Sequence, residues 1–247
     1  MPTPESISLD APLDELLDYA GRRFAVAFEP VSAAGRTLEV LQITNMAEYV
    51  ERIAEAATQG QGLDLPFWAR IWPASMVLAH MAASLPLGPG AELLEIGAGV
   101  GVCGLFAAAA GLHATITDIS HDALVFTRIN ALHNGLGDRV RVLRADFSAD
   151  RLGRRFDVII GAEVLYIERL HRGLVKFLGA HLRPREGAQA LLARNHERRS
   201  MRFFKLAEED FVMSNKTVGC KATGEDGEIE RHLCDIVRLV PRKVVAA

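Results

Sequence analysis

Three glycines stand close together in the segment Glu95 to Gly101, which reads E-I-G-A-G-V-G. Glycine has no Cβ atom, so this segment can turn sharply into a helix and let its backbone approach a bound ligand closely. A nucleotide-containing cofactor is the kind of ligand that such a loop holds. The residues expected to contact it are Gly97, Ala98, Gly99 and Gly101.

The glycines alone do not decide which cofactor binds. Gly99-x-Gly101-x-x-Gly104 also satisfies the dinucleotide fingerprint of NAD enzymes. Glu95 separates the two, because it ends a strand that should be buried, where an unpaired carboxylate is costly. The ammonium and sulfonium of S-adenosylmethionine would offset that cost, whereas the pyrophosphate of NAD would be repelled. The acid therefore favours S-adenosylmethionine, and an NAD-dependent oxidoreductase is a remote alternative.

Two further acids end the next two strand-like segments. Asp118 comes about twenty residues after the loop, where a carboxylate can accept hydrogen bonds from both ribose hydroxyls. Asp146 can accept from an adenine amino group, with Ile119 or Phe147 beside the ring. Each acid could instead cap a helix or lie solvated in a loop. Three acids that end three successive strands after a glycine loop nevertheless indicate a site for S-adenosylmethionine.

The elements that must position these side chains alternate between short apolar segments and helix-like ones. Strand-like segments are 92–96, 114–117, 140–143, 157–160 and 188–193, and helix-like segments are 100–110, 122–134 and 170–182. This alternation predicts an α/β, Rossmann-like fold with a mostly parallel sheet covered on both faces. Segments 217–222 and 233–239, joined by a turn at 224–227, predict an antiparallel C-terminal hairpin that closes the sheet.

An N-terminal block precedes this alternation. Residues 1 to about 20 predict a loose, weakly anchored leader with a short helix. Segments 23–28 and 36–43 have the apolar-polar alternation of an antiparallel hairpin, and a helix capped by Asn45 is expected over 45–58. We therefore expect an N-terminal extension, residues 1–64, packed on a core domain, residues 65–247.

Composition narrows the function classes. The 247 residues carry a formal net charge of -3, which gives no support to sequence-independent binding of nucleic acid. The three cysteines have no C-x-x-C spacing, so neither a disulfide framework nor a metal site is expected. The N-terminus does not resemble a secretory signal, and no segment has the roughly 18 uninterrupted apolar residues of a membrane span. These features predict a cytoplasmic protein that does not bind membranes.

With these motifs the sequence resembles the seven-strand S-adenosylmethionine-dependent methyltransferases from about Leu65 to Leu239. The segments P-F-W-A-R-I-W-P-A (66–74) and E-V-L-Y (163–166) more narrowly resemble methyltransferase family 16. That group contains many protein-lysine methyltransferases, including those acting on the electron-transfer flavoprotein β subunit. The resemblance implies a seven-stranded sheet, S-adenosylmethionine as methyl donor, S-adenosylhomocysteine as product, and a protein lysine ε-amine as acceptor.

The same resemblance implies roles for residues of this chain. The family's D/E-x-x-Y/F motif ends the fourth strand beside the target amine, so Glu163 and Tyr166 are the expected catalytic pair. Glu163 would orient the amine through a charge-assisted hydrogen bond, and Tyr166 would line the acceptor channel. Glu163 could instead cap the next helix, and Tyr166 could belong to the core. Trp72, from the tryptophan-proline element, and Ala162 complete the expected cofactor contacts.

Several neighbouring residues have two interpretations. Trp68 and Trp72 would share one face if helical, with Trp68 as a hydrophobic lid. Arg70 is either a partner of the cofactor's carboxylate or a surface charge, and His196 either faces the substrate or is an ordinary loop residue. The run 197–202 either starts a solvated helix or contacts an acidic substrate. A small-molecule N- or O-methyltransferase is an alternative, whereas no N-P-P-Y-type motif supports methylation of nucleic-acid bases.

Overall fold

The computed structural model describes residues 6–56, 66–88, 90–223 and 228–242, and its central element is a sheet in the order β5-β4-β3-β6-β7-β9-β8. The strands are β3 Glu92–Ile96, β4 His113–Asp118, β5 Val140–Arg144, β6 Val158–Ala162, β7 Gln189–Asn195, β8 Phe211–Thr223 and β9 Ile229–Pro241. Strands β3 to β7 pair in parallel, whereas β9 and β8 are antiparallel. The predicted α/β fold with a mostly parallel sheet and an antiparallel C-terminal hairpin is confirmed.

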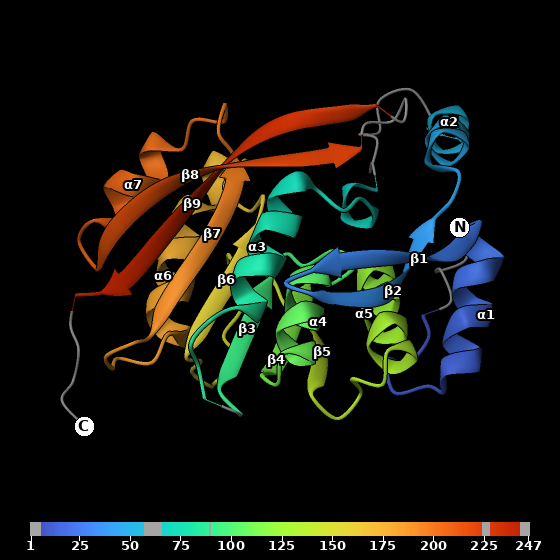
Figure 1. Ribbon diagram of the computed structural model, residues 1–247, viewed down its shortest axis with the longest axis horizontal. Helices are drawn as coiled ribbons and strands as arrows, with labels where there is room; N and C mark the ends of the chain where they lie inside the picture. Colours follow the sequence, from blue (N-terminus) through green and yellow to red (C-terminus); the bar gives the residue numbers. More distant parts are fainter. Residues whose placement is uncertain (1–5, 57–65, 89, 224–227, 243–247) are drawn as a thin grey trace.

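Helices cover both faces of this sheet (Figure 1). The helices α3 Pro73–Ala83, α4 Val102–Ala109 and α5 His121–His133 pack on one face, and α6 His171–His181 and α7 Met201–Ala207 on the other. Leu93 and Leu94 of β3 belong to the two opposite hydrophobic clusters, as the alternation of side chains along a strand requires. Two 3-10 helices, η1 Phe67–Ala69 and η2 Glu168–Leu170, precede α3 and α6. None of the helices in the described ranges is long and apolar enough to cross a membrane.

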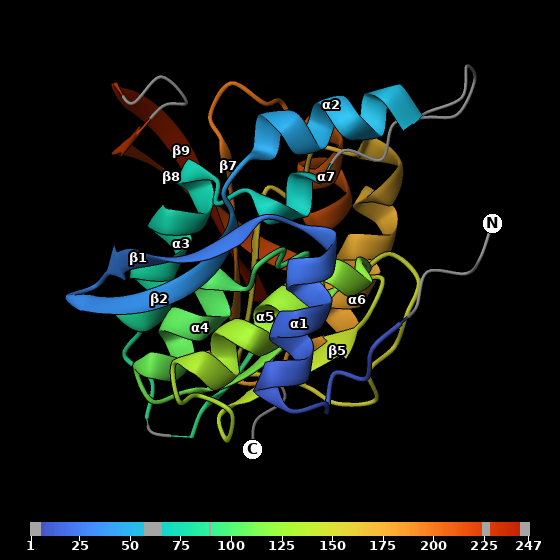
Figure 2. The ribbon, with the colours of Figure 1, turned by 90° about the vertical axis from the view of Figure 1, so that its right-hand side faces the viewer.

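The N-terminal elements are α1 Leu13–Arg23, the hairpin of β1 Val26–Ala33 and β2 Arg36–Ile43, and α2 Met46–Ala56. Helix α1 packs on α5 and the hairpin lies against α4 and α5 (Figure 2). The expectation of weak anchoring is wrong for α1, because Leu16 is fully buried and Tyr19 Oη donates to Asp122 of α5 at 3.2 Å. The Asn45 cap is confirmed by a 3.3 Å bond from the Glu48 N–H. Residues 1–5 and 57–58 lie outside the described part.

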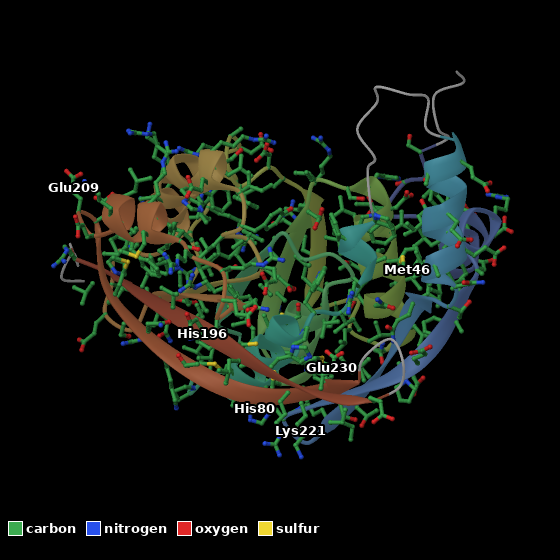
Figure 3. The ribbon with its side chains drawn as sticks, turned by 90° about the horizontal axis from the view of Figure 1, so that it is seen from above. Met46, His80, His196, Glu209, Lys221 and Glu230 are labelled. Atoms are coloured by element: carbon green, nitrogen blue, oxygen red, sulfur yellow. The ribbon has the colours of Figure 1, made fainter. Side chains whose placement is uncertain are left out.

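The β8–β9 hairpin is longer than predicted. Each strand has 13 residues, but β7 pairs with β9 only from Leu239 to Cys234. We call the part of the hairpin beyond that point, residues 219–223 and 229–233, the arm. Figure 3 places Lys221 and Glu230 of the arm at the opposite end of the hairpin from Glu209. The predicted turn at 224–227 lies outside the described residues.

Candidate functional site

The glycine loop has a backbone conformation that favours glycine. Gly97, Gly99 and Gly101 have φ angles of 57°, 57° and 81°, in the left-handed region. A Cβ atom on Gly99 would collide with the backbone carbonyl of Trp68, and one on Gly101 would lie 2.7 Å from Thr127 Cγ2. Three of the five loop residues therefore have no side chain, and the loop packs directly against Trp68 and Thr127.

Hydrogen bonds from α5 hold this loop in its conformation. Thr127 Oγ1 donates to the Gly99 carbonyl at 2.9 Å, and Asn130 Nδ2 donates to the Val100 carbonyl at 3.2 Å. Both side chains are fully buried. Since buried donors and acceptors are paired here, the loop is positioned before any ligand binds.

Asp118 ends β4 with its carboxylate beside the loop. Oδ2 accepts from the Gly99 N–H and Oδ1 from the Ser120 N–H, each at 2.9 Å. The N-cap of α5 is Ser120, whose Oγ accepts from the Ala123 N–H, so Asp118 does not cap that helix. Each carboxylate oxygen has a second lone pair, which leaves Asp118 able to accept from ribose hydroxyls.

Glu95 is paired with a backbone N–H of this protein, whereas the sequence suggested a cation of the cofactor as its partner. Its side chain is only 2% exposed, and Oε2 accepts from the N–H of Gly104 in α4 at 2.7 Å. Burial raises the pKa of Glu95 to about 7, against the lowering effect of the Gly104 N–H and Cys103. The argument that a cofactor cation must offset an unpaired carboxylate is therefore corrected: α4 supplies the donor. A direct contact between Glu95 and the cofactor stays a prediction.

Gly104, the last glycine of the possible dinucleotide fingerprint, is explained by the same contact. A Cβ atom there would lie 2.7 Å from Glu95 Oε2 and 2.7 Å from Ile116. The position needs glycine because α4 packs closely on β3 and β4. It therefore carries no information about a pyrophosphate.

The residues expected on the adenine side lie at the carboxyl ends of β4 and β5, which are neighbouring strands. Ile119 is 59% exposed, so its side chain is accessible to a planar ring. Phe147 Cε1 lies 3.6 Å from the Cβ position of Gly97. Asp146 Oδ1 accepts from the N–H and the Oγ of Ser148, at 2.7 and 2.6 Å. The Asp146 carboxylate therefore also stabilises the turn that follows it.

Glu163 follows β6 and combines burial, strain and an unpaired atom. It has a φ of 54°, which is costly for a residue with a side chain. Oε1 accepts from the Asn195 N–H at 2.7 Å, whereas Oε2 is buried and has no hydrogen-bond partner among the described residues. Burial raises the pKa of Glu163, opposed by the charge of Arg198 and the Asn195 N–H. The helix-cap alternative does not hold, since Leu170 is the N-cap of α6.

Tyr166 lies on the surface rather than in the core. It is 55% exposed, and the guanidinium carbon of Arg198 lies 5.7 Å from its ring centroid. The same Arg198 has Nε 3.7 Å from Glu163 Oε2. Arg198 thus joins the two predicted catalytic residues, although the sequence placed it in a solvated helix start. Helix α7 begins only at Met201, so the run 197–200 is a loop.

The two tryptophans lie on separate elements and do not share a helical face. Trp68, in η1, packs its ring on Phe24 and Phe126, with centroids 5.7 and 5.1 Å apart. Trp72 precedes α3 and donates from Nε1 to the Phe67 carbonyl at 3.2 Å. Arg70 places its guanidinium carbon 4.8 Å from the Trp72 ring centroid. The condition for a shared face, one continuous helix, is not met, because Trp68 lies in η1 and Trp72 precedes α3.

His196 lies in the turn after β7 and is about half exposed, and its ring contacts a buried polar cluster. Its Nδ1 lies 2.8 Å from Oδ1 of Asp235, which is 2% exposed. Asp235 also accepts from Thr217 Oγ1 and Arg194 Nη2, each at 2.8 Å. Burial alone would raise the pKa of Asp235, but these bonds and charges hold it below its usual value. The cluster ties β7, β8 and β9 together just beyond Glu163.

The fold and this site define the class of the protein, and solved structures share that fold. One is a TehB-like SAM-dependent methyltransferase from Corynebacterium glutamicum, with a TM-score of 0.52 and 16% identity, covering 80% of this chain and 98% of that one. Another is precorrin-6y C5,15-methyltransferase from Geobacter metallireducens, with a TM-score of 0.55 and 14% identity, covering 67% and 88%. The chain thus has the Rossmann-like fold of S-adenosylmethionine-dependent methyltransferases.

Residues 58–210 match a family model described as lysine methyltransferase, methyltransferase family 16. This is more than half of the chain, so the protein belongs to that family. A similar relative is protein N-lysine methyltransferase METTL21A of Mus musculus, 31% identical over 157 residues, which are 59% of this chain and 69% of the relative. Another is EEF1A lysine methyltransferase 3 of Xenopus tropicalis, 26% identical over 152 residues, 60% and 67%.

Membership in this family confirms the predicted activity, S-adenosylmethionine-dependent methylation of lysine. The methyl donor is S-adenosylmethionine, so the NAD-dependent alternative is set aside.

Proposed function

We propose that this chain methylates a lysine ε-amine of another protein and that Glu163 receives that amine. The observation that carries the proposal is Glu163 Oε2, which is buried and has no hydrogen-bond partner among the described residues. A buried carboxylate oxygen without a donor is costly. A donor that arrives with the substrate would remove this cost, and a lysine amine is such a donor.

The residues around the glycine loop support a matching place for S-adenosylmethionine. Because Gly97, Gly99 and Gly101 have no side chains, the cofactor can approach the backbone of the loop. Asp118 retains lone pairs that can accept hydrogen bonds from the ribose. Exposed Ile119, with Asp146 and Phe147, fits the adenine side. Trp72 and Ala162 complete the proposed set, because Ala162 is the last residue of β6 and Trp72 follows η1, whose Trp68 carbonyl lies against Gly99.

S-adenosylmethionine, when bound, supplies a methyl group on a positively charged sulfur. The protein's task is then to present a neutral amine in line with that group, mostly by positioning and electrostatics. A lysine ammonium has a pKa of ~10.4 and must lose a proton first. Glu163 Oε2 then accepts from the amine, and Tyr166 lines its approach. The bound cofactor would supply the methyl group and would keep the electron pair of the broken carbon–sulfur bond, and the methylated nitrogen would release its surplus proton to water.

The test uses the full chain, tritium-labelled S-adenosylmethionine and a dialysed cell extract. Acid hydrolysis followed by mass spectrometry should find the label in methyllysine. Glu163→Gln should lower the rate about 10²-fold or more, while calorimetry shows unchanged binding of S-adenosylmethionine. Label confined to small molecules would contradict the protein acceptor, and full activity of Glu163→Gln would contradict the assigned residue.

The proposal also includes the wider expectations from the sequence. It takes the methylated substrate to be a protein, expects no nucleic-acid partner, and places the enzyme in the cytoplasm. Residues 1–64 and 65–247 are proposed as an extension and a core domain. Digestion of the full chain by a low amount of proteinase K, which needs no lysine or arginine at the cut, would check that boundary, since a stable fragment should begin near residue 65.

A further inference from the structure

The loop between β7 and α7 is held in a defined conformation. Asn195 Oδ1 accepts from the Glu197 N–H at 2.9 Å, and the Asn195 carbonyl accepts from the Arg198 N–H at 3.2 Å. The Arg198 carbonyl accepts from the guanidinium of Arg194, which is itself paired with buried Asp235 at 2.8 Å. The backbone of Arg198 is therefore fixed, although its side chain is about half exposed.

The side chain of Arg198 lies between the two proposed catalytic residues. Its Nε is 3.7 Å from Glu163 Oε2, which is too long for a hydrogen bond, and its guanidinium carbon is 5.7 Å from the Tyr166 ring centroid. The carboxylate oxygen therefore feels a positive charge but keeps its hydrogen-bonding capacity. A substrate amine can donate to Oε2 while Arg198 stays in place.

We propose that Arg198 is a resident cation of the acceptor site that promotes loss of the proton from the incoming lysine. The inference rests on the proposed function, because it requires the amine at Glu163 Oε2. A positive charge 3.7 Å from the oxygen that receives the amine disfavours the ammonium form of the substrate and favours the neutral amine. The same charge favours the ionised form of Glu163, which must accept the amine's hydrogen bond.

The other groups that face Glu163 cannot replace this charge. Arg194 of β7 is paired with Asp235 of β9 at 2.8 Å, so its charge is largely balanced. Burial and the neighbouring Cys220 raise the pKa of Cys234 in β9 to about 12, so that thiol is neutral at physiological pH. Tyr166 contributes a ring face. Among the residues that the structure describes, Arg198 is the cation that lies within 4 Å of Glu163 Oε2.

The pH dependence of methyl transfer tests the proposal. Initial rates of methyllysine formation in the dialysed extract are measured from pH 6 to 10 for the full chain and for Arg198→Gln. The acid limb of the Arg198→Gln profile should move to higher pH by about one unit. Without Arg198, Glu163 loses a charge that stabilises its ionised form, and the bound amine loses a charge that opposes its protonated form. Arg198→Lys should restore the original limb. Arg199→Gln, an exposed neighbour with the same loss of charge, should follow the wild-type profile.

A superimposable profile for Arg198→Gln, or an equal shift in Arg199→Gln, would overturn the proposal while leaving the proposed function intact. A second measurement is independent of substrate. Carbon-13 NMR of the carboxyl of Glu163, assigned with Glu163→Gln, should show its pKa raised in Arg198→Gln and unchanged in Arg199→Gln; no difference between the variants would overturn the proposal. Absence of methyllysine with the wild-type chain would instead contradict the proposed function, and the NMR result would still decide whether Arg198 acts on Glu163.

Discussion

The glycine loop and the acceptor end of the sheet differ in how completely their polar groups are paired. In the loop, the N–H and the carbonyl of Gly99 both have partners, in Asp118 and Thr127. At Glu163, one carboxylate oxygen is buried without a hydrogen-bond partner in the described structure, and the backbone is strained. The backbone groups of Gly99 are thus paired within the protein, whereas Glu163, our proposed acceptor residue, leaves a hydrogen-bonding position that a substrate amine would fill.

The largest expected effect would break the loop. Gly99→Ala places a Cβ against the Trp68 carbonyl at a φ of 57°. We expect a loss of about 2–5 kcal/mol of stability and of measurable S-adenosylmethionine binding, from steric overlap and strain. Urea unfolding and calorimetry measure both. Gly135→Ala is the matched control, since its φ is 66° but nothing lies within 4 Å of the added atom; equal losses in the two variants would argue against a supporting role for Trp68.

A second prediction concerns Glu95, whose folded pKa is about 7 against an ordinary value of 4.5. Between these pH values the native state binds more protons than the unfolded state, so this group makes stability fall as pH rises, by up to ~3 kcal/mol. Glu95→Gln keeps an acceptor for the Gly104 N–H and should remove that fall. Unfolding free energies from pH 4.5 to 7.5 provide the check, and an unchanged slope in the variant would refute it.

A smaller effect is expected from Thr127→Val, which keeps the shape but removes the donor to the Gly99 carbonyl. We expect about 1–2 kcal/mol of destabilisation because a buried carbonyl is left unpaired. Binding of S-adenosylmethionine should weaken in parallel if the loop is prepositioned. Destabilisation without any change in affinity would show that the loop conformation does not depend on this bond.

The smallest expected effect is a difference in stability between two variants of Glu163, which measures backbone strain apart from the loss of the carboxylate. Glu163→Gly and Glu163→Ala both remove the carboxylate, but only glycine accepts a φ of 54° without strain. Both variants should be inactive, and the glycine variant should be more stable than the alanine variant by about 1 kcal/mol. Thermal unfolding of the two proteins measures this difference. Equal stabilities would mean that the backbone relaxes once the side chain is removed.

The fold and the positions of the glycine loop and Asp118 were largely predictable from the sequence, since both depend on local patterns. An apolar segment followed by an acid or a glycine gave β3 at its observed bounds, Glu92–Ile96, and placed Asp118 at the end of β4. The partner of Glu95 was not predictable, because it depends on how α4 turns back over β3. The sequence shows that an acid is buried without showing which backbone N–H faces it.

The acceptor side needed the structure for a similar reason. Arg198 reaches Glu163 because Arg194 binds its carbonyl and Asp235 holds Arg194, although Asp235 is 41 residues further along the chain from Arg194. That ion pair exists only because β9 runs antiparallel beside β7. The sole sequence signal was the arginine-rich run 197–202, which also fits a solvated helix start.

The arm of the β8–β9 hairpin has a consequence for self-association. Beyond β7, residues 229–232 of β9 have no neighbouring strand on the β7 side within the described structure, so their backbone groups could template a strand from another chain. Lys221 lies directly opposite Arg231, and both are exposed. Like charges in register weaken the arm's own pairing, and charged side chains along an open edge disfavour pairing with a strand of another chain. The arm thus gives up some rigidity in exchange for resistance to edge-to-edge aggregation.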